Sequence, residues 1–102
     1  MSARLEIEGT IDDAALDALR EALAREPDAE TALLVDMGEA DVESAAVVAR
    51  LADLLRREAR RLGAIELLSA PQTLAHTLYR IGALESGALV LIDPREELGS
   101  SG

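Results

Sequence analysis

The chain has 102 residues, of which 49% are hydrophobic and 29% charged, and its formal net charge is −10. This length holds a single hydrophobic core, and the composition is typical of a globular domain and excludes a disordered chain. Phosphate backbones are bound by clustered Lys and Arg, so nucleic acids and anionic membranes are not expected partners of so acidic a protein.

Residue types that are missing exclude further classes. There is no cysteine, so a disulfide framework, a thiol nucleophile and a Cys-ligated metal are excluded. The first residues lack the apolar segment of a signal peptide, and no apolar run approaches the length of a membrane span. We therefore expect a cytoplasmic protein that does not insert into the membrane. Its core must consist of Leu, Ile, Val and Ala, because Tyr79 is the one aromatic residue.

The first elements predicted are a strand and an amphipathic helix. Residues 4–10 alternate between apolar and acidic side chains, which is the period of a strand with one wet face. Asp12 or Asp13 can cap the helix that follows, and Pro27 ends it. The expected apolar stripe of this helix comprises Ala15, Leu16, Leu19, Ala22 and Leu23.

A second strand, an acidic loop and the longest helix are predicted next. Residues 31–37 hold a continuous apolar run, which indicates a central strand buried on both faces. An acidic loop over residues 36–44 then leads into a helix from about Ser44 to residue 62, with Gly63 as its C-cap. The residues expected to point inward from this helix are Val47, Val48, Leu51, Leu54, Leu55 and Leu62.

The last part of the chain repeats the alternation. Residues 64–68 are predicted as a strand, and Pro71 starts a short helix that Gly82 ends. Residues 88–92 form the last predicted strand, followed by a truncated helical turn from Asp93. The apolar stripe of the short helix is expected at Leu74, Leu78 and Ile81.

The order β-α-β-α-β-α-β predicts a single small α/β domain with a mainly parallel sheet of four to five strands. This domain is expected over residues 1–98, and the Gly/Ser-rich residues 99–102 are expected to form a flexible tail. Function in parallel sheets usually lies at the carboxyl ends of strands, which directs attention to residues 36–44.

Charge is concentrated in the first half of the chain. Through Ser44 there are thirteen acidic residues and three arginines, whereas from residue 45 onward there are seven of each. Ser44 lies at the start of the longest helix with Glu43 before it. The one basic cluster occupies the last turns of that helix, where it suits the helix dipole and a solvated face; it comprises Arg56, Arg57, Arg60 and Arg61.

Other candidate sites are weak. His76 has no second ligand at metal spacing and is interpreted as a surface histidine. No Gly-rich phosphate loop and no Ser/His/Asp motif is present, so we expect no enzymatic activity and no cofactor. Four carboxylates have the composition of a Ca²⁺ or Mg²⁺ loop but lack EF-hand spacing, and we interpret them as a solvated acidic loop; they are Asp36, Glu39, Asp41 and Glu43.

Five segments of the chain follow a common family pattern in register. They are Leu5-x-Ile7-x-Gly9-x-Ile11-Asp12, Leu34-Val35-Asp36-Met37, Val42-Glu43-Ser44-Ala45-Ala46-Val47, Gly63-x-Ile65-x-Leu67, and Ala70-Pro71 through Leu78 to Gly82-Ala83-Leu84. Together these segments resemble the STAS domain, the family of the bacterial anti-sigma factor antagonists. The resemblance covers nearly the whole chain, from Leu5 to about Leu98.

The resemblance implies a regulatory module of signal transduction and transcription control that works by partner switching. Its phospho-acceptor would be Ser44, with Glu43 in place of the acid before it, and its partner an anti-sigma factor that is also a serine kinase. The unmodified form would bind this partner, and the phosphorylated form would release it. Partner contacts are expected around the Ser44 loop and the start of the helix, at Met37, Asp41, Val42, Glu43, Ala45 and Val47.

Two alternatives stay open. Ser44 is equally suited to a plain helix N-cap. Ala45 and Ala46 stand where the family pattern has a second Ser and a Gly, which favours an accessory STAS subunit that is never phosphorylated, such as one on the ATPase of a lipid-transport ABC system.

Overall fold

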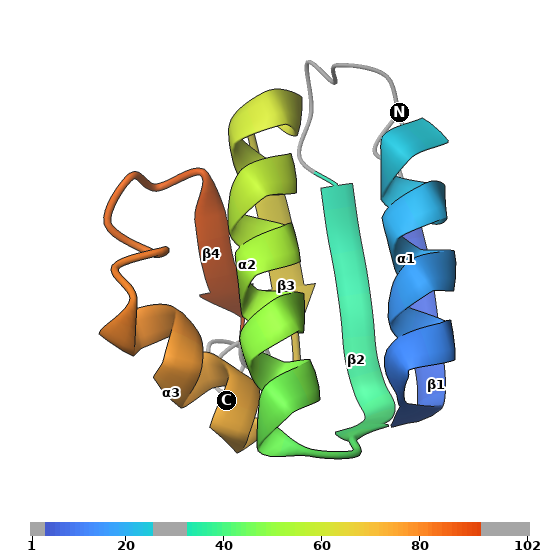
Figure 1. Cartoon of the computed structure of the whole chain (residues 1–102). Coiled ribbons are helices and arrows are strands. Elements are labelled where there is room, and N and C mark those ends of the chain that lie inside the picture. Colours follow the sequence, from blue (N-terminus) through green and yellow to red (C-terminus); the bar gives the residue numbers. More distant parts are fainter. Residues whose placement is uncertain (1–3, 26–32, 93–102) are drawn as a thin grey trace, which may run out of the picture.

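The computed structural model describes residues 4–25 and 33–92. Their elements alternate along the chain as predicted (Figure 1). They are β1 (Arg4–Ile11), α1 (Asp13–Arg25), β2 (Leu33–Val42), α2 (Ala45–Leu62), β3 (Ile65–Leu68), α3 (Gln72–Arg80) and β4 (Leu89–Ile92). The helical turn expected from Asp93, the tail at 99–102, Pro27 and residues 31–32 lie outside the described residues.

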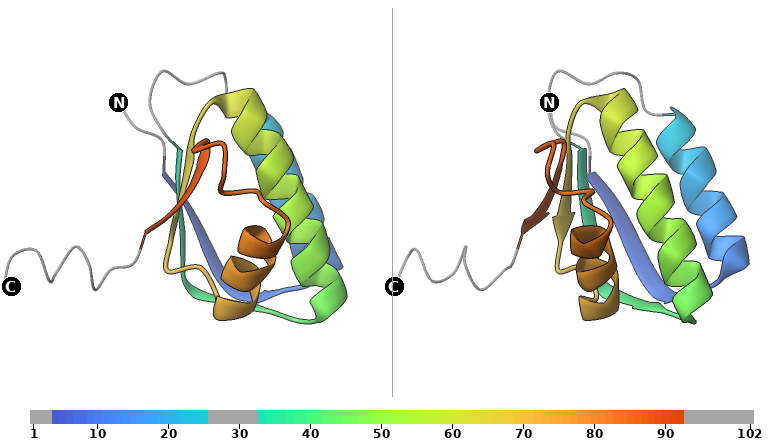
Figure 2. Two further views of the ribbon diagram at one scale, coloured as in Figure 1. Left: turned by 90° about the vertical axis from the view of Figure 1, so that its left-hand side faces the viewer. Right: turned by 60° about the vertical axis from the view of Figure 1, so that its left-hand side comes forward.

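The sheet is parallel and its strand order is β1-β2-β3-β4, which confirms the predicted class. Each strand lies beside the next one in the chain, and a helix makes each crossover. Crossovers between parallel strands are right-handed, so an order that never reverses directs every helix to the same side. Figure 2 shows this directly: α1, α2 and α3 all cover one face of the sheet.

The core lies between that face and the helices. The predicted stripes of α1 and α2 point inward, with Leu23, Leu51 and Leu55 completely buried. From the sheet, alternate residues of β2 and β3 meet them, and Val35 and Leu67 are likewise completely buried. Leucine, isoleucine, valine and alanine supply nearly all of this core, and Met37 completes it.

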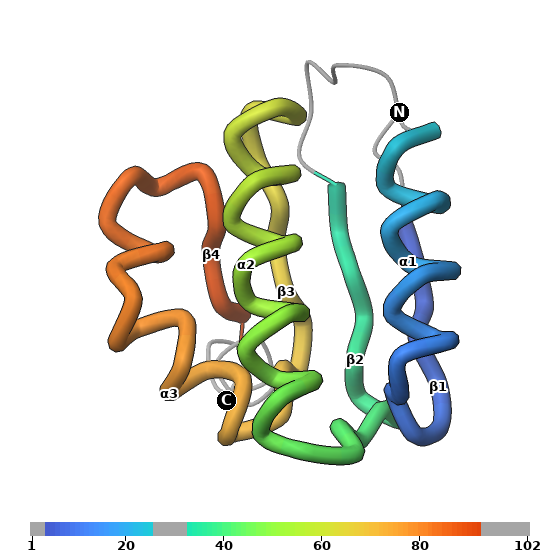
Figure 3. The backbone as a smooth tube through the Cα atoms, viewed as in Figure 1, coloured from blue at the N-terminus to red at the C-terminus, as the bar shows by residue number. Residues whose placement is uncertain are grey.

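The prediction of an acidic loop over residues 36–44 is wrong for most of that range, because residues 36–42 belong to β2. β2 continues to Val42 because the second half of β1 pairs with it, from Glu8 opposite Glu39 to Ile11 opposite Val42. A register shift between Glu6 and Glu8 accommodates the extra residue of β2. Only residues 43–44 remain between β2 and α2, and Figure 3 shows the short path of the chain there.

Three local predictions also need correction. β1 ends at Ile11, one residue beyond the predicted range, and includes Gly9 at a φ of 79°. β2 is central, but one of its faces is not covered, since Leu34 is only half-buried. Ile81 is 40% exposed because α3 ends at Arg80, one residue before it, so the apolar stripe of α3 consists of Leu74 and Leu78.

The helix ends follow the predicted caps. The Asp12 Oδ1 atom accepts a hydrogen bond from the Ala15 amide at 2.8 Å, which caps α1. Gly63 ends α2 at a φ of 94°, a backbone conformation in which glycine carries no Cβ penalty. α2 therefore starts and stops at defined residues, and the start is where the candidate site lies.

Candidate functional site

Ser44 is the N-cap of α2. Its backbone is extended, with φ −152° and ψ 165°, and its Oγ atom accepts a hydrogen bond from the Val47 amide at 3.3 Å. The Ser44 carbonyl accepts the first bond of the helix, from the Val48 amide at 3.0 Å. The residue is nevertheless exposed. Its hydroxyl therefore satisfies one amide of the helix end through a part-buried hydrogen bond, on a residue that is exposed overall.

The junction around Ser44 is tied to the sheet. The Glu43 amide donates to the Ile11 carbonyl at 3.0 Å, so the residue before the cap is held at the end of β1. One residue earlier, the Asp41 carboxylate accepts from the Val42 amide at 3.0 Å. These bonds place Ser44 in a fixed position relative to the carboxyl ends of β1 and β2.

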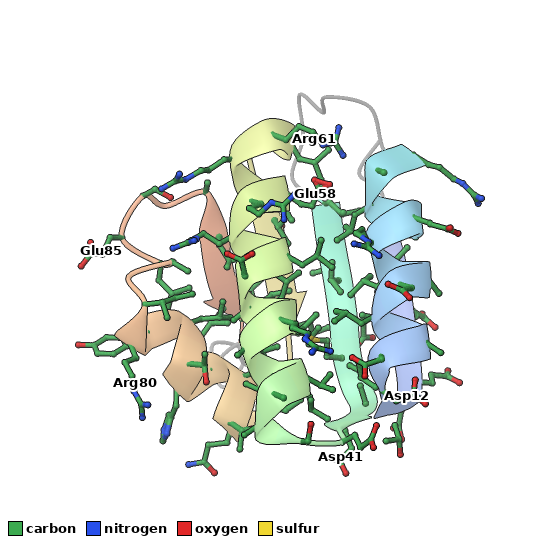
Figure 4. The ribbon with its side chains drawn as sticks, in the orientation of Figure 1. Asp12, Asp41, Glu58, Arg61, Arg80 and Glu85 are labelled. Carbon is green, nitrogen blue, oxygen red and sulfur yellow. The ribbon has the colours of Figure 1, made fainter. Side chains whose placement is uncertain are left out.

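Acidic side chains gather at this end of the molecule. Asp12, Asp41 and Glu43 are all exposed, and the first two are labelled close together in Figure 4. They come from the turn after β1 and from the end of β2, which lie side by side in the sheet. The surface on the α1 side of Ser44 is therefore negative.

On its other side Ser44 borders a hollow of about 390 Å³ between α2 and α3. The far wall of this hollow belongs to α3 and carries the basic groups His76 and Arg80. Arg80 is labelled on α3 in Figure 4. Ser44 thus lies between an acidic surface and a wall with basic groups. The lining residues are Val42, Ser44, Ala45, Val48, Thr73, His76, Thr77 and Arg80.

The predicted contact residues divide into surface and core. Asp41, Glu43 and Ala45 are exposed, and Val42 is half-buried at the edge of the hollow. Two others, Met37 and Val47, are 1% and 3% exposed and pack in the core. These two side chains support the site from beneath and are not presented at its surface.

The sequence did not reveal the α3 side of the hollow. The spacing of its residues, 73, 76, 77 and 80, does predict that they share one helix face. It does not say which neighbour that face meets, because α2 and α3 pack through contacts distant in sequence. His76 is exposed, as predicted for a surface histidine, but it lines the hollow beside Ser44. Tyr79, the one aromatic residue, lies on the same helix with 80% of its surface exposed.

The four carboxylates Asp36, Glu39, Asp41 and Glu43 do not form a metal site in the described residues. The Asp36 carboxylate pairs with Arg4 at 2.7 Å and accepts a hydrogen bond from the Gly38 amide at 3.0 Å, five residues before Asp41 in the same strand. Within residues 4–25 and 33–92, no group of three or more His, Asp or Glu side chains could hold a metal ion. In this part of the chain, too, no helix is both long and apolar enough to cross a membrane.

Fold and site together define a small α/β domain with an exposed serine at the N-terminus of its longest described helix. The STAS domain family model matches residues 3–98, and the chain belongs to this family. STAS domains mediate protein–protein interactions and are generally regulatory modules without enzymatic activity. A search of curated proteins finds no match.

Proposed function

We propose that the protein is a non-enzymatic regulatory module, similar to the anti-sigma factor antagonists, whose partner binds around Ser44 and is released when Ser44 is phosphorylated. The observation that carries the proposal is the position of Ser44, an exposed residue at the N-cap of the longest helix and beside the hollow between α2 and α3. The partner is an anti-sigma factor with serine kinase activity in a bacterial partner-switching pathway.

The helix end favours a phosphate at this position. The first amides of α2 point toward the N-terminus, where the helix dipole is positive, and anions are stabilised there. A phosphate on Oγ can take over the hydrogen bond that the hydroxyl now accepts from the Val47 amide. Modification therefore leaves the fold intact and changes the surface.

The change at the surface is electrostatic. A phosphoserine adds up to about two negative charges. Asp41 and Glu43 are already exposed on one side of Ser44, so the new charge strengthens a negative surface. A partner that meets this surface with acidic or closely packed apolar groups is then repelled, which is the switching step.

The accessible surface proposed for the partner has two parts. The first is the exposed end of β2 and start of α2, at Asp41, Glu43 and Ala45, together with half-buried Val42. The second is the α3 wall of the hollow, where His76 and Arg80 can pair with carboxylates of the partner.

The N-cap role of Ser44 favours a second candidate function, that of an accessory subunit without a phosphorylation switch. Ser44 already has a structural task, and Ala45 and Ala46 replace the Ser and Gly of the family pattern. These features suit an accessory STAS subunit that is bound permanently to an ABC-type ATPase and is never phosphorylated. The same surface would serve, without a switch.

The first experiment tests modification. The protein is incubated with ATP and candidate anti-sigma factor kinases encoded near its gene, and phosphate is mapped by mass spectrometry. We expect phosphate at Ser44 and its loss in Ser44→Ala. Ser86→Ala is the matched control, because Ser86 is also exposed and also accepts a backbone amide at 3.3 Å. Absence of phosphate at Ser44, with stable co-purification of an ABC ATPase, would favour the accessory subunit.

The second experiment separates charge from capping. Ser44→Asp and Ser44→Asn both keep a good N-cap, but only the first adds a charge. We expect Ser44→Asp to weaken binding of the identified partner about tenfold or more, and Ser44→Asn to change it by less than about threefold. Equal affinities for the two variants, measured by calorimetry, would refute an electrostatic switch.

A further inference from the structure

The face of the sheet opposite the helices has no covering layer among the described residues. Figure 2 shows the three helices on one side and none on the other. Burial alternates accordingly along residues 33–37 of β2 and along β3, where every second residue is buried and the residues between are half-buried. Val90 of β4 is 43% exposed. We call this surface the open face.

The register places apolar side chains of the open face next to one another. Leu34 pairs with Glu66, which pairs with Val90, so these three form one row across the sheet. The row beside it joins Asp36, Leu68 and Ile92. None of the four apolar residues in these rows belongs to the core or packs against it; they are Leu34, Leu68, Val90 and Ile92.

Charge on the open face is negative and unbalanced. Arg4 of β1 contacts the carboxylates of Asp36 and Glu6 at 2.7 and 3.4 Å. Glu66 lies between Leu34 and Val90 and makes no ion pair with any described residue. Further along the same two strands, exposed Glu8 and Glu39 pair with each other and line one hollow with Glu6 and Asp36. The carboxylates on this face therefore outnumber the Arg4 guanidinium, and they lie beside the apolar side chains of the two rows.

We propose that the open face binds an amphipathic helix of a partner protein, with an apolar stripe flanked by Lys or Arg. Four strands spaced by about 4.8 Å span about 14 Å, which matches one helix of about 10 Å diameter. The apolar stripe covers the leucine, valine and isoleucine side chains, and a basic residue of the helix pairs with Glu66. The open face and the helix layer, at one end of which Ser44 lies, are on opposite sides of the sheet. The inference therefore does not depend on the proposed switch.

Two other occupants fit the charge less well. A second copy of the chain would set one negative face against another and bury two Glu66 carboxylates together, with each copy carrying a net charge of −10. The chain's own residues 93–102 contain three acidic residues, one arginine and a single large apolar residue, Leu98. A second copy therefore offers apolar side chains without an excess of basic groups, and residues 93–102 offer neither an apolar stripe nor a net positive charge.

The test uses a synthetic peptide of about 15 residues, roughly four helical turns, with leucines on one stripe and arginines beside it. A scrambled peptide of the same composition and a peptide with glutamates in place of the arginines are the controls. Binding to the full chain is measured by calorimetry, and the contact surface is mapped by amide chemical shifts. We expect the basic amphipathic peptide alone to shift the amides of β2, β3 and β4.

Variants decide whether the charge at the open face matters. Glu66→Arg is expected to weaken binding of the basic peptide about tenfold or more, because it replaces an attraction by a repulsion within an apolar contact. Glu21→Arg is the matched control: Glu21 is exposed on α1, and its reversal changes the net charge equally, so less than about a threefold effect is expected. Circular dichroism checks that both variants are folded.

Three outcomes would overturn the proposal. The first is equal binding of the scrambled or glutamate peptide, and the second is equal loss in Glu66→Arg and Glu21→Arg, since either would indicate general attraction to an acidic protein. The third is a concentration-dependent dimer whose shifted amides lie on the open face, which would assign the surface to a second copy.

Discussion

The two faces of the sheet contrast although they are formed by the same strands. On the covered face, Val35, Ile65 and Leu67 are completely buried beneath the helices. On the open face, their neighbours Leu34 and Leu68 are only half-buried. Apolar residues occur on both faces, so composition does not distinguish them. What distinguishes them is the order in which the strands lie.

Strand order decides where helices go. In a doubly wound sheet the order reverses at one point, and right-handed crossovers then place helices on both faces. Here the order β1-β2-β3-β4 never reverses, so all three helices cover one face. An apolar residue in a strand can therefore lie either in the core or at the surface, and the strand order determines which.

Truncation of adjacent leucines tests the contrast most strongly. Leu67→Ala removes a completely buried side chain and is expected to lower the free energy of unfolding by about 3 kcal/mol. Leu68→Ala, on the open face, is expected to cost less than about 1 kcal/mol. Urea titration followed by circular dichroism measures both. Similar losses would show that the second face is covered after all.

The helix layer can be tested at its two N-caps. The Asp12 carboxylate accepts its amide at 2.8 Å, whereas the Ser44 hydroxyl accepts at 3.3 Å. We expect Asp12→Ala to destabilise the protein by about 1 kcal/mol and Ser44→Ala by about 0.5 kcal/mol. Thermal unfolding of both variants gives the comparison. A larger cost at Ser44 would mean that this serine is needed mainly as a cap, in favour of the accessory subunit.

The smallest effect is expected from an ion pair of the open face. Arg4→Ala removes the contacts to Asp36 and Glu6, but the Arg4 side chain is 52% exposed, so the loss should be no more than about 0.5 kcal/mol. Added salt should reduce it further. Arg20→Ala breaks the ion pair with Asp17, in which both side chains are more exposed than those of Arg4 and Asp36, so the loss in the free energy of unfolding should be smaller. A loss above about 1 kcal/mol for Arg4→Ala would show that this pair is shielded from solvent.

Most of the fold could be predicted from local patterns. Alternation marked β1, apolar stripes marked α1 and α2, and Gly63 marked the end of α2 within a residue of the observed position. Ser44 was found as a helix start, and the structure places it at the N-cap. These features depend on residues a few positions apart, so the sequence contains them directly.

Features built by distant residues could not be predicted in this way. Residues 38–42 carry glycine and acids, which locally favour a loop, yet they form a strand because β1 pairs with them. The hollow beside Ser44 needs α3 to pack against α2, which no local pattern specifies. The same holds for Met37 and Val47, whose places in the core follow from the packing of α2 on the sheet.

The sequence by itself determined the alternating elements, the parallel α/β class, the acidic first half and one serine at the start of the longest helix. Tertiary structure decided how far β2 extends, which wall faces Ser44 and which face of the sheet is open. The physical reason is the range of the interactions: capping and periodicity act within one or two helical turns, whereas strand pairing and helix packing join residues dozens of positions apart.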